Sequence, residues 1–344
     1  MTVQADGVPE RSDLLRGFLD RNGLAAATIA PLADDCSFRR YFRVHRGAEN
    51  YVVMDAPPDL EDVVPFATLS GLLNRFGYSA PRVLAKDTGD GFLLLDDFGD
   101  ATYTKALSRG ADEWSLYALA LDVLVDLGHR PVNAMPATIP AYDDDKLLAE
   151  VAMFADWYLV PGLGLEVSEE MREAYLSAWR ECLPVLRGAP ECLVLRDYHV
   201  DNLMVIAARD GLGACGLLDF QDAVIGPSSY DVVSLLQDSR RDIAEDLVTA
   251  MLERYFDSMG PDIDRAAFLR SYHAFGAQRA LKVFGIFTRQ SVLYGNHGYL
   301  EHIPRLWRHT EANLRIPELS GVRDWVDQAV PREMRLTPKP GGGV

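Results

Sequence analysis

The sequence predicts an α+β fold in which a small antiparallel β-sheet lobe precedes a larger, mainly helical lobe. Residues 1–97 contain five short apolar runs of strand type, with one helical pattern before them and one among them. After residue 98 the apolar spacing is helical almost to the end of the chain, apart from one hairpin. We therefore expect a first lobe at 1–97, a second at 98–336 and a flexible, Pro/Gly-rich tail at 337–344.

The elements of the first lobe follow from the apolar spacing. Residues 9–22 form an expected amphipathic helix that ends at Asn22-Gly23, and a second helix is expected over 60–76, before Gly77. The five expected strands cover 27–32, 41–45, 51–54, 82–85 and 92–95.

The second lobe is expected to be built from helices around one hairpin. The hairpin strands, 203–206 and 216–220, flank a Gly-rich turn at 209–213. The longest expected helix, 265–294, contains Gly276 and Gly285. The expected helices cover 112–128, 143–159, 168–186, 230–237, 243–259, 265–294 and 301–314.

Charge and composition narrow the class of protein. The chain has 344 residues and a net charge of −17, which disfavours a nucleic-acid groove because phosphate binding needs clustered cations. No apolar run approaches the roughly 20 residues of a membrane helix, and the polar N-terminus has no secretory pattern. The four cysteines have no C-x-x-C spacing. A cytoplasmic monomer, without membrane or nucleic-acid partners, is expected.

The hairpin carries the residues that indicate chemistry. Asp197 lies five residues before Asn202, and Asp219 follows the apolar run at 216–218. Phosphoryl transfer needs one carboxylate to accept the proton of the acceptor hydroxyl, and oxygen ligands to hold Mg²⁺. The pattern matches the protein-kinase signature, with Leu195 in place of its His and Gln221 in place of its Gly. The competing interpretation is an ordinary hairpin with turn-forming Asp and Asn at its ends.

Residues of the first lobe are candidates for nucleotide binding. The backbone of Leu95 and Asp97 lies where a kinase linker would meet adenine. No G-x-G-x-x-G motif precedes the second strand, and Met54 stands where the usual lysine would be. The turn offers other phosphate ligands, with Arg40 favoured: Ser37, Arg39, Arg40 and Arg43.

Further polar residues have two interpretations each. Asp231 is expected to cap a helix or to support the catalytic loop, and His199 to bind the loop or the acceptor. Asp156 and Trp157 on one helix, like Arg279 on another, suit a sugar site, although aromatics at helical spacing are more often core residues.

The segments Arg-Asp-Tyr-His-Val-Asp-Asn, Leu-Asp-Phe-Gln and Gly-Pro-Ser-Ser-Tyr-Asp together resemble the aminoglycoside phosphotransferase superfamily. The resemblance runs from about residue 32 to 314. It implies a protein-kinase-like bilobal fold, ATP as co-substrate, Asp197 as the base, Asn202 and Asp219 as Mg²⁺ ligands, and Asp231 as support for the loop.

Other segments, among them Ser-Phe-Arg-Arg-Tyr-Phe-Arg-Val and Phe-Ala-Asp-Trp-Tyr-Leu, resemble a subgroup that phosphorylates the anomeric hydroxyl of N-acetylmuramate and N-acetylglucosamine in peptidoglycan recycling. Arg279 or Lys282 would then meet the lactyl carboxylate. Two alternatives stay open. An aminoglycoside or choline kinase would use the acidic residues 143–145 and Glu150, and a nucleotide-binding pseudokinase scaffold would explain the missing lysine.

Overall fold

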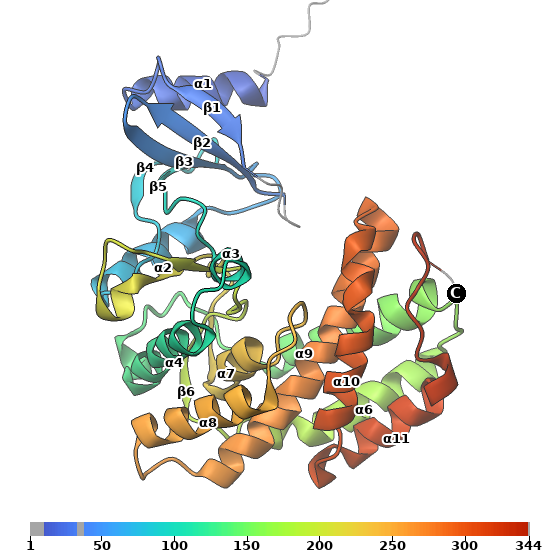
Figure 1. Cartoon of the computed structure of the whole chain (residues 1–344). Coiled ribbons are helices and arrows are strands. Elements are labelled where there is room, and N and C mark those ends of the chain that lie inside the picture. Colours follow the sequence, from blue (N-terminus) through green and yellow to red (C-terminus); the bar gives the residue numbers. More distant parts are fainter. Residues whose placement is uncertain (1–9, 33–37, 343–344) are drawn as a thin grey trace, which may run out of the picture. The chain divides into compact units, whose positions relative to one another are not determined.

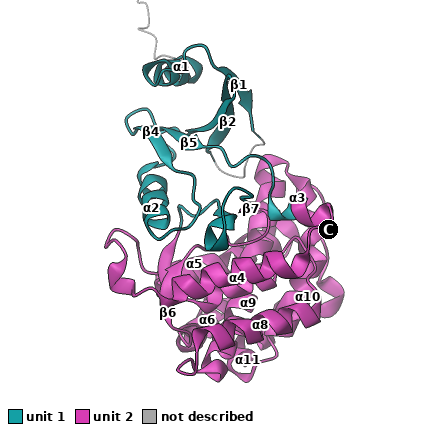
Figure 2. Cartoon of the chain, turned by 60° about the vertical axis from the view of Figure 1, so that its left-hand side comes forward, with its two compact units in different colours: residues 1–105, 204–222 teal, residues 106–203, 223–344 magenta. Residues whose placement is uncertain are grey.

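The computed structural model describes residues 10–32 and 38–342, which fall into two compact units. Unit 1 consists of residues up to 105 and of 204–222; unit 2 consists of 106–203 and 223–344 (Figure 2). The predicted boundary after Asp97 therefore lies eight residues early. The hairpin after Asn202, expected in the helical lobe, groups with unit 1.

Unit 1 is a five-stranded antiparallel sheet with order β1-β2-β3-β5-β4 (Figure 1). All five predicted strands and both predicted helices form. Helix α1 packs Leu15, Phe18 and Leu19 into one core with Val44 and Phe92 of the sheet. The elements are α1 (Arg11–Arg21), β1 (Thr28–Pro31), β2 (Arg40–Arg46), β3 (Glu49–Asp55), α2 (Val64–Arg75), β4 (Val83–Asp87) and β5 (Phe92–Asp96).

The hairpin of residues 203–220 contacts the rest of unit 1 through hydrogen bonds and one pair of aromatic rings. Strands β7 (Leu203–Val205) and β8 (Cys215–Leu217) pair with each other. The Leu217 N–H donates to the Ser79 carbonyl at 2.7 Å, and the Ser79 hydroxyl donates to the Gly213 carbonyl. The Phe66 and Phe220 rings lie 4.9 Å apart between centroids. Burial of these groups fixes the hairpin on unit 1.

Unit 2 is organised around one long helix, α9 (Arg265–Tyr294) (Figure 1). A Cβ at Gly276 would collide with Asn313, and one at Gly285 with the Met153 backbone, so both glycines allow close helix packing. The expected helix at 143–159 becomes α5 (Asp144–Met153) followed by a π-helix, Phe154–Gly162. Phe154, the first residue of this π-helix, packs its ring against those of Phe284 and Trp307.

The remaining elements of unit 2 surround α9. The short sheet of β6 and β9 was predicted only in part, and α3 and α11 were not predicted. The α-helices and strands of unit 2 besides α5 and α9 are α4 (Glu113–His129), α6 (Glu169–Leu186), β6 (Glu191–Val194), β9 (Val224–Pro227), α7 (Ser229–Leu236), α8 (Glu245–Met259), α10 (Ile303–Asn313) and α11 (Ser320–Ala329). Helix α3 (Tyr103–Ser108) contains the position in the sequence where unit 1 ends and unit 2 begins.

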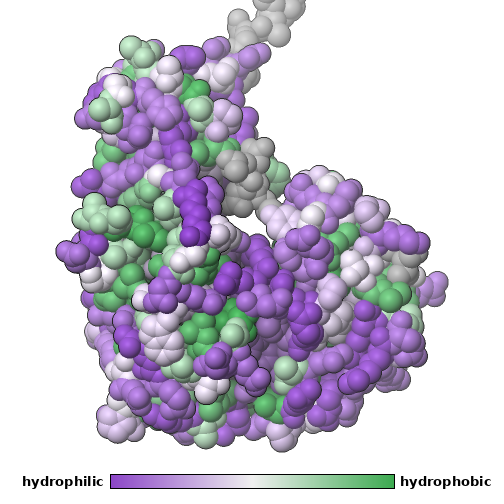
Figure 3. All heavy atoms as spheres, in the orientation of Figure 1, coloured by the Kyte–Doolittle hydropathy of each residue, from purple (hydrophilic) through white to green (hydrophobic). Residues whose placement is uncertain are grey.

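Two observations concern the surface and the C-terminus. On the face shown in Figure 3, hydrophobic residues form small separate patches among hydrophilic ones. Among the described residues, no helix has the length and apolarity needed to span a membrane. Pro338 is buried, and the Gly341 N–H donates to the Ser291 hydroxyl at 3.4 Å, so this part of the segment expected to be a flexible tail contacts unit 2.

Candidate functional site

The loop from Leu195 to Asn202 follows β6. The side chains of Asp231 and Arg279 fix it through hydrogen bonds to its backbone. The N–H groups of Leu195 and Arg196 donate to the two carboxylate oxygens of Asp231 at 2.5 and 2.9 Å. Arg196 has a φ of 73°, a left-handed conformation that costs about 1–3 kcal/mol for a residue with a side chain. Its carbonyl accepts a hydrogen bond from Arg279 Nη1 at 3.0 Å. These contacts stabilise the conformation that presents the next residue, Asp197.

The side-chain carboxylate of Asp197 is the candidate hydrogen-bond acceptor of the loop. The residue is half-buried, and no described residue donates a hydrogen bond to its carboxylate. Burial opposes ionisation, but the Lys282 and Arg279 cations outweigh it and lower the pKa of Asp197. An ionised carboxylate without an internal donor can accept a proton or a hydroxyl hydrogen bond.

His199 is a buried part of the loop. Its Nε2 faces two donors, Asn202 Nδ2 at 3.4 Å and Arg240 Nη1 at 3.3 Å, so this nitrogen acts as the acceptor. Burial and the Arg240 cation lower the pKa of His199, which keeps the ring neutral. Asn202 Nδ2 also donates to the Asp197 carbonyl at 2.9 Å. The geometry thus ties His199 to the loop, as the structural alternative expected.

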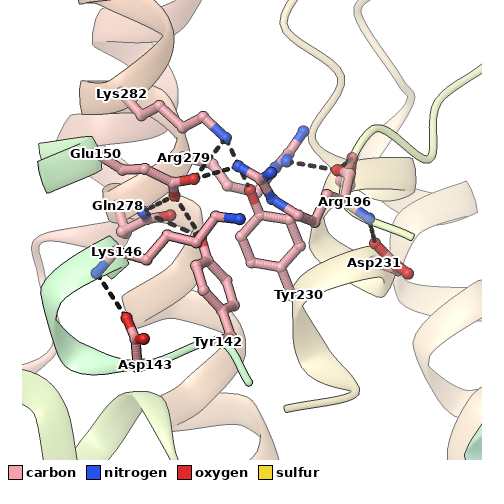
Figure 4. Close-up of polar contacts among 11 residues, drawn as sticks. Tyr142, Asp143, Lys146, Glu150, Arg196, Tyr230, Asp231, Gln278, Arg279 and Lys282 are labelled. Atoms are coloured by element: carbon pink, nitrogen blue, oxygen red, sulfur yellow. Dashed lines mark hydrogen bonds and ion pairs between the residues drawn. The ribbon is translucent and has the colours of Figure 1, made fainter. Parts of the chain in front are cut away.

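A buried cluster of charged and polar side chains contacts the loop through Arg196 in unit 2 (Figure 4). Glu150 of α5 accepts hydrogen bonds from the Arg196 guanidinium and, at 2.8 Å, from Gln278 Nε2, and it lies 3.2 Å from Lys282 Nζ. The Tyr142 hydroxyl donates to the same carboxylate. Glu150, Arg196 and Lys282 are each less than 10% exposed. We refer to Tyr142, Glu150, Arg196, Gln278 and Lys282 as the Glu150 cluster.

The charges of the Glu150 cluster stabilise one another. Burial alone would raise the pKa of Glu150, but Lys282 and Arg196 outweigh it and lower the pKa to about 2. Burial likewise opposes the charge of Lys282, whereas Tyr230 and Glu150 raise its pKa. Glu150 therefore stays ionised and fixes the Arg196 side chain, next to Asp197 in the chain.

The three arginines proposed as phosphate ligands each have an acidic partner in unit 1. Arg39 pairs with Glu61 at 2.8 Å, and Arg40 pairs with the buried Asp55 at 2.7 Å. About half of the Arg40 side chain is exposed, compared with 12% of Arg39. Ser37 lies outside the described residues.

The end of β5 is held by an arginine. Arg43 Nε lies 2.7 Å from Asp97 Oδ2, and the same guanidinium contacts Asp100 at 3.0 Å. Leu95 pairs with Val52 inside the sheet. The Asp97 side chain therefore anchors the strand end. Met54 is fully buried, so its position is part of the core.

Two residues proposed to contact the sugar, Asp156 and Trp157, belong to the π-helix Phe154–Gly162. Asp156, on the π-helix, is exposed and forms a bidentate pair with Arg172 at 2.7 and 2.9 Å. Trp157 is half-buried.

Asp219 lies in unit 1 with a φ of 55° and accepts a hydrogen bond from Gln221 Nε2 at 2.6 Å. The structure thus brings together Asp197, His199, Asn202, Asp231 and Arg279 within unit 2.

Sequence reasoning missed the role of Glu150 and of the Arg196 side chain. Glu150 was considered only as a partner for a cationic acceptor, but its carboxylate is occupied by Arg196 and Lys282. The three other acidic residues of that group lie at the exposed start of α5, where Asp143 accepts the Lys146 N–H and Asp144 pairs with Arg187. The one available signal was the position of Glu150 among the apolar residues of α5.

Comparisons with known proteins agree with this architecture. A family model described as "Phosphotransferase enzyme family" matches residues 28–269. The chain is 41% identical over 307 residues to an N-acetylmuramate/N-acetylglucosamine kinase of Pseudomonas aeruginosa, covering 86% of each chain. It is 34% identical over 363 residues to a protein of the same name from Caulobacter vibrioides, covering 95% of this chain and 98% of that one.

Solved structures share the fold at low sequence identity. Choline kinase LicA from Streptococcus pneumoniae superposes with a TM-score of 0.63 at 10% identity, over 90% of this chain and all of that one. Aminoglycoside 2′-phosphotransferase-IIIa, solved as a GDP complex, gives a TM-score of 0.60 at 15% identity, over 89% of this chain and all of that one. The predicted kinase-like fold and family resemblance are confirmed.

Proposed function

The chain belongs to the phosphotransferase enzyme family, and from this premise we propose that it is an ATP-dependent kinase of amino sugars. Its acceptor would be the anomeric hydroxyl of N-acetylmuramate or N-acetylglucosamine, and its product the sugar 1-phosphate. The names of the relatives at 34% and 41% identity support this acceptor class. A cytoplasmic place in cell-wall recycling follows from the same proposal, because the reaction consumes ATP and these sugars derive from peptidoglycan.

One observation carries the chemical part of the proposal. Asp197 is an ionised, half-buried carboxylate with no hydrogen-bond donor among the described residues, on a loop fixed by Asp231 and Arg279. An anomeric hydroxyl is more acidic than an ordinary alcohol. A carboxylate of low basicity can therefore orient it and accept its proton late in a loose transition state.

The proposed reaction follows directly. The anomeric oxygen of the sugar attacks the γ-phosphorus of ATP, the bond from that phosphorus to the β,γ-bridging oxygen breaks, and the hydroxyl proton passes to Asp197. ADP leaves with the bridging oxygen. Asp231 keeps Leu195 and Arg196 in place during this step, because its two oxygens accept their N–H groups.

The residues present suit a magnesium ion. Asn202 carries an amide oxygen and Asp219 a carboxylate, and both are ligand types that Mg²⁺ takes. Mg²⁺ is commonly held by one or two protein oxygens together with substrate phosphates. When bound, the ion would neutralise charge on the phosphates. We propose Asn202 and Asp219 as its ligands.

Nucleotide and sugar contacts complete the proposal. Arg40 is the favoured phosphate ligand, because about half of its side chain is exposed and, among the described residues, it pairs with one carboxylate, that of Asp55. Arg39, Ser37 and the backbone near Leu95 and Asp97 remain further candidates for the nucleotide. Arg279, His199, Asp156 and Trp157 remain candidates near the sugar. Three of the four carboxylates expected to bind a cationic acceptor, those of Glu150, Asp143 and Asp144, already have partners in the chain, which disfavours an aminoglycoside or choline.

The test uses purified protein with ATP and Mg²⁺ and a panel of acceptors. The panel contains N-acetylmuramate, N-acetylglucosamine, their 1-O-methyl glycosides, an aminoglycoside and choline. We expect ADP release with the two free sugars only, and a ³¹P signal coupled to the anomeric proton. Equal turnover of the methyl glycosides would refute anomeric transfer, and turnover of choline or the aminoglycoside alone would refute the acceptor class.

A further inference from the structure

Arg289 stands apart from the other arginines of the chain. Within residues 10–32 and 38–342, every arginine that is at least partly buried has an ion pair or hydrogen bond, except Arg289. Its side chain is half-buried, and its Nε is shielded from solvent without an acceptor. The other arginines without such a partner are all exposed: Arg16, Arg75, Arg109 and Arg315.

A shielded guanidinium N–H without an acceptor is costly. Leaving a buried donor unsatisfied costs roughly 1–3 kcal/mol, and more when the group is charged. Such a group is stabilised when a ligand supplies the acceptor. The planar guanidinium matches a carboxylate in two parallel hydrogen bonds, so the chemistry favours that ligand.

The position of Arg289 on α9 connects it with the candidate site. Arg289 follows Lys282 by seven residues, which places both on one face of the helix about 10 Å apart along its axis. Ile286, also half-buried, lies between them on the same face. The positive charge of Lys282 lowers the pKa of Asp197. Arg289 therefore lies on the same face of α9 as Lys282 and closer to the C-terminal end of the helix.

The nearer cations already have partners. Arg279 donates to the Arg196 carbonyl and lies over the Tyr230 ring, with 4.8 Å from Cζ to the ring centroid. Lys282 is buried against Glu150. Both cations thus already interact with protein groups, whereas Arg289 has no such partner among the described residues.

We propose that Arg289 binds the carboxylate of the acceptor sugar and so favours N-acetylmuramate over N-acetylglucosamine. The inference rests on the proposed function, since N-acetylmuramate carries a lactyl carboxylate that N-acetylglucosamine lacks. The separation of about 10 Å from Lys282 suits a substituent remote from the reacting hydroxyl.

The test compares Arg289→Ala, Arg289→Lys and the wild type on both sugars and on ATP. For Arg289→Ala we expect the KM for N-acetylmuramate to rise roughly 10- to 100-fold, the usual worth of a charge-assisted contact. The kcat, the KM for N-acetylglucosamine and the KM for ATP should stay within about twofold. Arg289→Lys should be intermediate, because it keeps the charge and loses the bidentate geometry.

Two controls separate a ligand contact from a structural effect. Arg315→Ala removes an exposed arginine without a partner from the same unit and should change no parameter. The methyl ester of N-acetylmuramate removes the carboxylate without touching the protein. The wild type should bind this ester as weakly as Arg289→Ala binds the acid, and the variant should show no further loss with the ester.

Each alternative result has a distinct meaning. An equal rise in KM for both sugars, or a rise for ATP, would overturn the assignment in favour of a ring or phosphate contact. Unchanged kinetics in Arg289→Ala would also overturn it. If the wild type phosphorylates neither sugar, the proposed function fails and the inference falls with it, whereas activity on N-acetylglucosamine with no effect of Arg289 refutes the inference alone.

Discussion

Glu150→Gln tests whether the Glu150 cluster stabilises unit 2 through charge. The substitution keeps the size of the side chain and removes the anion that faces Arg196 and Lys282. The lowering of the pKa of Glu150 from 4.5 to about 2 corresponds to about 3 kcal/mol of stability at neutral pH. Removing one partner of a buried ion pair typically costs about 3–5 kcal/mol, which agrees with this figure.

The effect has a defined dependence on pH. Because the pKa of Glu150 is lowered in the folded state, its contribution is present above pH 4.5 and is lost as the pH falls toward 2. Urea unfolding of wild type and Glu150→Gln should therefore differ by about 3 kcal/mol at pH 7, and the gap should narrow below pH 4.5. Far-UV circular dichroism gives the two midpoints.

Asp156→Asn is the matched control. Asp156 and Arg172 form a bidentate pair of good geometry, but each side chain is 40% exposed, so its loss should cost at most about 1 kcal/mol. Equal midpoints for wild type and Glu150→Gln, or a loss in Glu150→Gln no larger than in Asp156→Asn, would refute the argument that burial makes the Glu150 cluster strong.

Three further outcomes follow from the proposed mechanism. Asp197→Asn should lower kcat roughly 10²–10⁴-fold while the Kd for ATP, measured by calorimetry, stays unchanged; near-normal turnover would remove Asp197 from the reaction. Asp219→Ala should abolish Mg²⁺-dependent turnover, because the amide of Asn202 is a weaker ligand for a hard cation; an unchanged Mg²⁺ titration would show that the ion is held elsewhere. Arg40→Ala should raise the KM for ATP roughly 10- to 100-fold and leave the sugar KM unchanged, and wild-type ATP dependence would exclude Arg40 as the phosphate ligand.

Local sequence by itself determined much of this protein. Short apolar runs of strand type predicted all five strands of the β1-β2-β3-β5-β4 sheet. The helical pattern over 265–294 predicted α9 over its full length. The spacing of Asp197, Asn202 and Asp219 predicted a phosphotransferase, and the segments around these residues predicted the family.

Only the tertiary structure decided which cations have partners. Glu150 is separated from Arg196 and Lys282 by 46 and 132 residues, and no local pattern signals a contact over such distances. For the same reason the sequence could not show that Arg279 and Lys282 are occupied and Arg289 is not. Pairing depends on how α5, α9 and the catalytic loop pack together, and burial then sets the strength of each charge interaction.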